Sequence, residues 1–146
     1  MNQGLLVATR KRRFKNRDDN YPTPKMLYDE LDKRFHFDFD PCPANPNGLR
    51  EFDGLGEWLG KSIYINPPYS KPLPWIKRAI EEQRKGKTIV MLLKSDTSTI
   101  WFHDYVVPNA RVIFIKGRVN FKGGPSPFPN LIAIFEPKFT FSHDIR

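Results

Sequence analysis

The sequence has a single cysteine, Cys42, and no long apolar run. One cysteine cannot form a disulfide within the chain, and with three histidines it gives no recognisable spacing of zinc ligands. A membrane helix needs about 18 consecutive apolar residues, and the apolar stretch at 4–8 is too short even for the core of a signal peptide. These absences exclude a disulfide scaffold and a zinc finger. They predict a cytoplasmic protein with no bound metal and no membrane partner.

Acidic residues are missing from the first 17 positions, whereas the whole chain has 24 basic and 16 acidic residues and a net charge of +8. Beyond position 17 the net charge is only +2. A purely basic segment suits a polyanion because each phosphate contact releases condensed counterions. We therefore predict a nucleic-acid partner; the alternative is a solvated terminus that only adds solubility. The basic residues of this segment are Arg10, Lys11, Arg12, Arg13, Lys15 and Arg17.

Apolar spacing and proline positions predict alternating helices and strands. Thr23 followed by Pro24 is typical of a helix start, with Thr23 as N-cap and Pro24 at the first helical position. Period-two alternation predicts a strand before Pro41, and an unbroken apolar run predicts a central strand. The patterns place helices at about 24–34, 75–84 and 99–107, and strands at about 35–40, 62–66, 88–93, 111–116 and 131–135.

This order predicts an α/β fold whose sheet is mainly parallel and has helices on both faces. The last two strands are joined without a helix, so we expect them to form an antiparallel pair at one edge. The length suffices for one hydrophobic core, which predicts a single domain. We place this domain at 21–146, after a basic, disordered tail at 1–20.

Ligands of open α/β sheets bind beyond the carboxyl ends of the strands, so the residues that follow strands are the first candidates for a site. Asp40 follows the first predicted strand and opens a proline-rich loop, Asp40-Pro41-Cys42-Pro43. The second predicted strand ends at the tetrapeptide Asn66-Pro67-Pro68-Tyr69.

The tetrapeptide resembles the catalytic motif of S-adenosylmethionine-dependent methyltransferases that act on exocyclic or amide nitrogens. Thr23-Pro24 resembles the amino-terminal cofactor element of the adenine-specific DNA enzymes, residues 40–44 their first cofactor motif, and Asp53-Gly54-Leu55 their acidic turn. From Tyr21 to Glu136 the chain is similar to the small phage-type DNA N-6-adenine methyltransferase family.

The resemblance implies S-adenosylmethionine as cofactor, DNA as partner and a reduced Rossmann-like methyltransferase sheet. The sheet would be reduced because too few residues separate Asp40 from Asn66 for two further strand-helix units. The residues that the resemblance implies for cofactor binding are Thr23, Pro24, Asp40, Cys42, Asp53 and Asn66.

The chemistry of the tetrapeptide supports the same function. The lone pair of an adenine amine is delocalised into the ring, so a site must draw the nitrogen toward tetrahedral geometry. The side-chain oxygen of Asn66 and the carbonyl of Pro67 could accept its two hydrogens. Pro67 and Pro68 would fix the backbone, and Tyr69 would stack on a base flipped out of the duplex. The alternative is a rigid strand-to-helix turn.

Each remaining candidate also has a simpler explanation. Asp40 could pair with the cofactor ammonium or cap a turn, and Asp53 could bond the cofactor adenine or only form an Asp-Gly turn. Thr23 could contact the cofactor or only cap a helix. Arg118 and Lys122, in the predicted loop at 117–130, could contact DNA or belong to an ordinary surface loop.

Two other functions stay open from the sequence. The same geometry would serve a methyltransferase for the exocyclic amine of cytosine or for glutamine. A non-catalytic nucleic-acid-binding domain is the third possibility, in which the basic tail makes the contacts.

Overall fold

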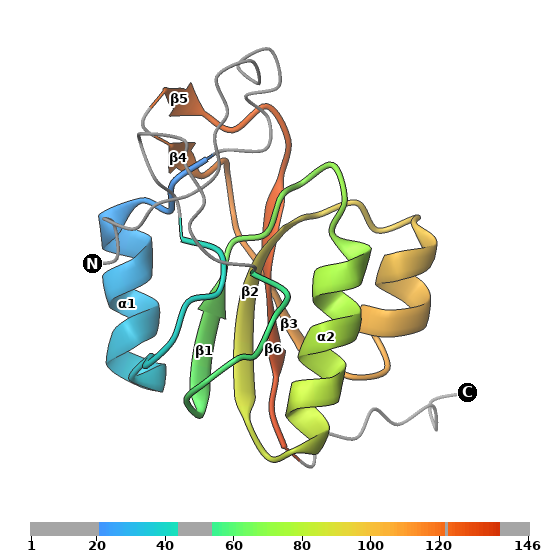
Figure 1. Ribbon diagram of the computed structural model, residues 1–146. Coiled ribbons are helices and arrows are strands. Elements are labelled where there is room, and N and C mark those ends of the chain that lie inside the picture. The colour runs from blue at the N-terminus through green and yellow to red at the C-terminus, as the bar shows by residue number, and fades with distance from the viewer. Residues whose placement is uncertain (1–20, 44–53, 122, 138–146) are drawn as a thin grey trace.

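A four-stranded mixed sheet with helices on both faces forms the centre of the protein (Figure 1). The structure is a computed structural model, and it describes residues 21–43, 54–121 and 123–137. The strands of the sheet are β1 (Ser62–Ile65), β2 (Thr88–Lys94), β3 (Arg111–Phe114) and β6 (Asn130–Phe135). Their order across the sheet is β1-β2-β6-β3.

The prediction of a mainly parallel sheet is wrong. Only β1 and β2 pair in parallel, whereas β6 is antiparallel to both β2 and β3. Parallel neighbours need a crossover connection, but β3 reaches β6 without a helix and therefore pairs with it antiparallel. This antiparallel pairing was predicted and is confirmed. Of the two strands, however, only β3 is an edge strand, because β6 lies inside the sheet next to β2.

The predicted strand at 35–40 is reduced to one isolated parallel bridge between Phe39 and Ile63. The Asp38 N–H donates to the carbonyl of Ser62 at 2.8 Å, and the Tyr64 N–H donates to the carbonyl of Phe39 at 3.1 Å. Pro41 has no N–H to extend the ladder. The bridge nevertheless places Asp40 beside β1, toward the end of the sheet where β1 finishes.

Two α-helices and one π-helix pack on the sheet. They are α1 (Lys25–Phe35), α2 (Leu73–Arg84) and η2 (Trp101–Val106). In η2 the Val107 N–H donates to the carbonyl of Phe102, five residues earlier, so the predicted helix has the wider π spacing. The N-cap of α1 is Pro24 and has no side-chain cap, which corrects the prediction for Thr23. None of the described helices combines the length and the apolar character needed to cross a membrane.

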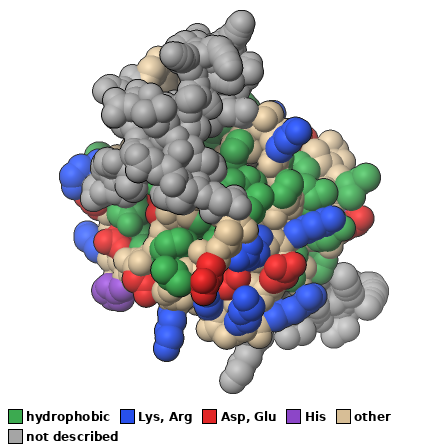
Figure 2. All heavy atoms as spheres, viewed as in Figure 1, with side chains coloured by type: hydrophobic (Ala, Val, Ile, Leu, Met, Phe, Trp, Pro, Cys, Tyr) green, Lys and Arg blue, Asp and Glu red, His purple; other side chains and the backbone are tan. Residues whose placement is uncertain are grey.

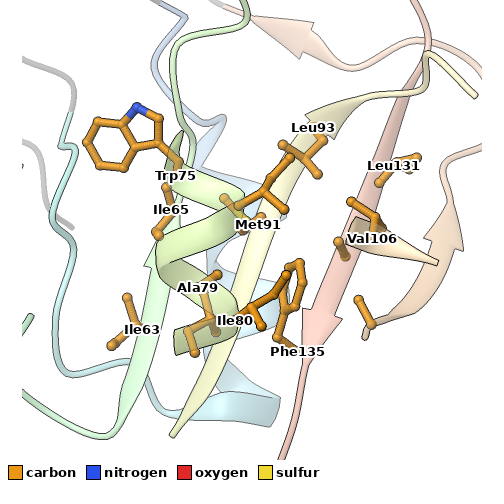
Figure 3. Close-up of a cluster of buried hydrophobic side chains, with 14 of the residues drawn as sticks. Ile63, Ile65, Trp75, Ala79, Ile80, Met91, Leu93, Val106, Leu131 and Phe135 are labelled. Carbon is orange, nitrogen blue, oxygen red and sulfur yellow. The ribbon is translucent and has the colours of Figure 1, made fainter. Parts of the chain in front are cut away.

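Alternating side chains of the strands build two cores. The odd-numbered apolar residues of β1, β2 and β6 face α2 and η2, as Figure 3 shows for Ile63, Met91 and Phe135. The even-numbered ones face α1, where Leu31 is buried. The prediction of helices on both faces is thus confirmed. Burial on both faces explains why β2 and β6 lack polar alternation.

A two-stranded hairpin connects β3 to β6. Its strands are β4 (Asn120–Phe121) and β5 (Gly124–Pro125). Figure 1 shows this hairpin at the upper end of the molecule, toward which β1 and β2 point and where β6 begins. The segment that precedes α1 lies at the same end.

Candidate active site

The carboxyl ends of β1 and β2 and the first residue of β6 lie at the same end of the sheet. The register places Lys94, the last residue of β2, opposite Asn130. Asn66 follows β1 directly. Because β6 runs antiparallel to β2, β6 begins at the end of the sheet where the two parallel strands finish. We take this end of the sheet as the candidate active site.

Asn66 presents an unpaired acceptor. Its Nδ2 donates to the main-chain oxygen of Tyr21, 45 residues away in sequence. A carbonyl can only accept, so the atom that faces Tyr21 must be the amide nitrogen. Oδ1 of Asn66 is buried and has no hydrogen-bond partner within the described part of the chain. The carbonyl oxygen of Pro67 also accepts no hydrogen bond from the described residues.

Tyr69 lies in a cluster of aromatic rings. Its side chain is 7% exposed. The ring of Phe128 packs edge-on against it with centroids 4.9 Å apart, and the Tyr21 ring is 5.8 Å away. Burial raises the pKa of the Tyr69 hydroxyl, although a hydrogen bond with Asn130 opposes this. A base can stack on Tyr69 only if a neighbouring ring moves, so the stacking role stays a prediction.

Asn130 is a member of the site that sequence reasoning missed. The residue is 1% exposed, and its Nδ2 donates to the carbonyl of Leu93 at 3.1 Å and to the hydroxyl of Tyr69 at 3.3 Å. The only signal in the sequence is a polar residue at the head of an apolar strand. The contribution of the Tyr21 carbonyl was also missed, because a main-chain atom leaves no residue-type signal.

Thr23 connects the segment before α1 to β1, and Pro24 belongs to the first turn of α1. The Thr23 hydroxyl shares a 2.7 Å hydrogen bond with the Tyr64 hydroxyl, and the carbonyl of Pro24 accepts from the Tyr28 N–H at 3.0 Å. Thr23 therefore has a local role that differs from the predicted cap. It sits beside β1, two residues after the carbonyl that orients Asn66.

Asp40 is a half-buried acid whose Oδ1 accepts from the Cys42 N–H at 2.9 Å. Burial raises the pKa of Asp40 to about 7, although this hydrogen bond lowers it. Among the described residues no Lys, Arg or His forms an ion pair with Asp40. Cys42 packs against the core beneath α2. Asp40 is therefore an acid with no cationic partner within residues 21–43, 54–121 and 123–137.

The segment at 54–58 packs beside residues 41–43. A Cβ on Gly54 would lie 2.5 Å from the carbonyl oxygen of Pro41 and 2.5 Å from the ring of Trp75, so glycine is required for this close approach. The Trp58 indole donates to the carbonyl of Gly54 at 2.7 Å. Asp53 itself lies outside the described residues.

Comparison with known proteins identifies the family. A family model described as DNA N-6-adenine-methyltransferase (Dam) matches residues 10–130, which is most of the chain. The chain belongs to this family. The matched stretch begins at Arg10, so it also includes the basic residues that we expected to lie outside the resemblance.

Two phage relatives of the Dam family are similar over much of the chain. The DNA N-6-adenine-methyltransferase of Haemophilus phage HP1 (strain HP1c1) is 31% identical, with 90% of this chain and 87% of the relative covered. The protein of the same name from Escherichia phage T1 is 33% identical, with 67% of this chain covered. In that case the match spans only 45% of the relative.

The predicted DNA contacts of this Dam family member are only partly within the described residues. Arg118 is exposed, and its Nη1 donates to the carbonyl of Ser126 at 3.1 Å, so it braces the loop that leads to Phe128. Lys122 and the six basic residues between Arg10 and Arg17 lie outside the described ranges. Their contact with DNA stays a prediction.

Proposed function

We propose that the chain transfers a methyl group from S-adenosylmethionine to the exocyclic amine of adenine in DNA. Membership of the Dam family supports this reaction, and both phage relatives carry the name of such an enzyme. The observation that carries the proposal is the orientation of Asn66. The Tyr21 carbonyl holds its nitrogen, which leaves a buried oxygen available for an amine hydrogen.

The residues at this end of the sheet fit the cofactor. S-adenosylmethionine supplies a methyl group on a positively charged sulfur, and it also carries an ammonium group. Asp40 offers a carboxylate without a cationic partner in the described part of the chain, and Thr23 and Cys42 lie beside the same strand end. We assign the ammonium end of the cofactor to Asp40 and an adjoining part to Thr23, Pro24 and Cys42. Asp53 is proposed for the cofactor adenine.

The chain contributes to the reaction by orienting the amine. Oδ1 of Asn66 and the carbonyl of Pro67 accept its two hydrogens, which directs the nitrogen lone pair at the methyl group. The prolines at 67 and 68 hold the second acceptor in place. The proton that the amine loses goes to water. Since a duplex hides this amine, the base must leave the stack, and Tyr69 is proposed to receive it.

The mixed sheet agrees with a reduced Rossmann-like methyltransferase fold, which we propose for the domain at 21–146. The connection between Asp40 and β1 is too short for two further strand-helix units. We further propose that the enzyme works in the cytoplasm of a bacterial host, because both relatives are phage proteins.

The test is to identify the methylated base. The protein is incubated with methyl-labelled S-adenosylmethionine and DNA, and the DNA is digested to nucleosides for mass spectrometry. We expect label on N6 of adenosine. Label on N4 of cytidine would overturn the base assignment. Absence of cofactor binding in calorimetric titration would instead favour a non-catalytic DNA-binding domain.

A further inference from the structure

Asn130 joins Tyr69 to the central strands. Its Nδ2 bridges the Leu93 carbonyl, at 3.1 Å, and the Tyr69 hydroxyl, at 3.3 Å. The Leu93 carbonyl can only accept, which fixes the orientation of the Asn130 amide without reference to Tyr69. Within the described residues no other hydrogen bond is made by the Tyr69 side chain. The hydroxyl end of the ring is therefore attached to the end of β2 through Asn130.

The backbone around Asn130 is held on both sides. The Ser95 N–H donates to the carbonyl of Pro129 at 2.8 Å, and the Ile115 N–H donates to the carbonyl of Asn130 at 3.2 Å. Tyr69, in contrast, lies in a turn between β1 and α2. Asn130 holds the hydroxyl end of its ring, and the edge-on contact with Phe128 lies against the ring itself. The fixed partner of the pair is Asn130, and the positioned partner is Tyr69.

We infer that Asn130 is a positioning residue for Tyr69 and keeps its ring at the place where it receives the base. The inference rests on the proposed function, because a fixed ring position matters only if Tyr69 stacks on adenine. A ring whose far end is already held loses less freedom when the base arrives. Asn130 acts through Tyr69 and does not itself contact the substrate.

Gln83 provides a matched control. It is also a buried amide, at 9% exposure, and its Nε2 also bridges two acceptors, the carbonyls of Asn109 at 2.9 Å and Glu136 at 2.8 Å. Glu136 follows the end of β6, whereas Asn130 begins that strand, so the two amides lie at opposite ends of the sheet. Asn130→Ala and Gln83→Ala remove equivalent bridges, and only the first bridge involves Tyr69.

The experiment measures single-turnover methyl transfer for both variants with saturating cofactor and DNA. Asn130→Ala should lower the rate about threefold, as Tyr69→Phe does, with unchanged cofactor affinity, and Gln83→Ala should lower stability without lowering the rate of the folded protein. In the Tyr69→Phe background, Asn130→Ala should add almost nothing, since the shared hydrogen bond is already lost. If Asn130→Ala does not fold, Asn130→Leu replaces it, because leucine fills nearly the same volume and has no donor for Tyr69.

The possible results separate the two proposals. A wild-type protein that does not methylate adenine would overturn the proposed function and, with it, the role of Asn130. An active wild type in which Asn130→Ala is no slower than Gln83→Ala would overturn the inference alone. Losses that multiply in the double variant with Tyr69→Phe would show that Asn130 acts by another route, and would also overturn it.

Discussion

Two amide oxygens at the candidate site, Oδ1 of Asn66 and Oδ1 of Asn130, are buried without a partner among the described residues. An unpaired buried acceptor costs about 1–3 kcal/mol, so a fold keeps one where another requirement outweighs stability. For Asn66 we assign that requirement to the substrate amine. For Asn130 it is the orientation of the amide, whose nitrogen serves Leu93 and Tyr69.

Replacement of Asn66 by alanine tests the acceptor. Asn66→Ala should lower methyl transfer about a hundredfold, because an interaction made mainly in the transition state is lost. Cofactor affinity and the fold should largely survive. Asn109→Ala is the control, since Nδ2 of Asn109 likewise donates to one main-chain carbonyl, that of Tyr105. Activity of Asn66→Ala within a few-fold of wild type would refute the assignment.

Tyr69 variants separate the ring from the hydroxyl. Tyr69→Phe keeps the aromatic face and loses only a 3.3 Å hydrogen bond, so it should keep most of the activity, within about threefold of wild type. Tyr69→Ala should lose roughly 1–3 kcal/mol of base affinity, because the stacking surface is gone. Equilibrium binding to DNA provides the measurement, with urea unfolding to account for the cavity in Tyr69→Ala. Equal losses in both variants would assign the role to the hydroxyl instead.

Asp40 should make cofactor binding depend on pH. Burial raises the pKa of its carboxyl to about 7, and only the ionised form can pair with an ammonium group. Cofactor affinity should therefore rise from about pH 6 to about pH 8 in the wild type. Asp40→Asn should bind more weakly and show a flat profile over this window. Calorimetric titration across the series is the measurement, and a parallel rise in both proteins would contradict the role of Asp40.

The raised pKa of Asp40 also makes the stability of the fold depend on pH. The folded pKa of Asp40 lies above its ordinary value of 3.8, so the native state binds this proton more tightly than the unfolded state. The contribution of Asp40 to stability is full below about pH 4 and is lost as the pH rises through about 7. The free energy of unfolding of Asp40→Asn should decline less over that window than that of the wild type.

At the scale of elements, local sequence predicts which segments become helices and strands but not how the strands pair. The apolar run of β2 was predicted as a central strand, and β2 is indeed covered on both faces. The position of β6 depends on pairs such as Ile89 with Phe135, which no local pattern contains. For the candidate site, the sequence indicates Asn66 because it follows β1, and Asp40 because it follows a predicted strand that the structure reduces to a bridge. Asn130 could not be predicted, since its contact with Tyr69 spans 61 residues.

Helix α2 fixes the segment at 54–58 through a buried charge cluster. Glu82 is 1% exposed and forms ion pairs with Arg78 at 2.9 Å and Lys87 at 2.8 Å, and with Lys85 at 3.2 Å. Arg78 also donates to the carbonyls of Leu55 and Gly56, and Lys87 to that of Trp58. The cluster thereby connects α2 to the segment that packs beside residues 41–43.

Glu82→Gln should destabilise the fold by roughly 2–4 kcal/mol, because it removes the charge that three cations surround. Burial opposes ionisation of Glu82, but the interactions with Lys87, Arg78 and Lys85 outweigh it and lower the pKa to about 2. A lowered pKa stabilises the fold above about pH 4.5, and the effect disappears as the pH falls toward 2. Urea unfolding at neutral and acidic pH measures both effects. Exposed Glu81→Gln is the control, and equal losses in the two variants would contradict the prediction.

At the scale of the whole molecule, positive charge is concentrated outside the described core. The net charge is +8, and the segment at 10–17 supplies six basic residues without an acid. Figure 2 shows Lys and Arg side chains interspersed with Asp and Glu on the face in view. Several of them form ion pairs, such as Lys25 with Asp29. A mixed surface attracts phosphates weakly, so the basic segment is the stronger candidate for DNA attraction.

Deletion of residues 1–17 tests this division between DNA binding and chemistry. If the six basic side chains lie along phosphates, affinity should fall most at low salt, since each duplex contact contributes a slope near −0.9. The salt dependence should flatten by as much as about five units. Cofactor affinity, which serves as the folding control, and the identity of the methylated base should not change, because phosphate contacts position the protein without reading sequence. Binding isotherms over a salt series are compared for the full-length and truncated proteins. Parallel slopes would instead assign DNA binding to the core, through Arg118 and the hairpin between β3 and β6.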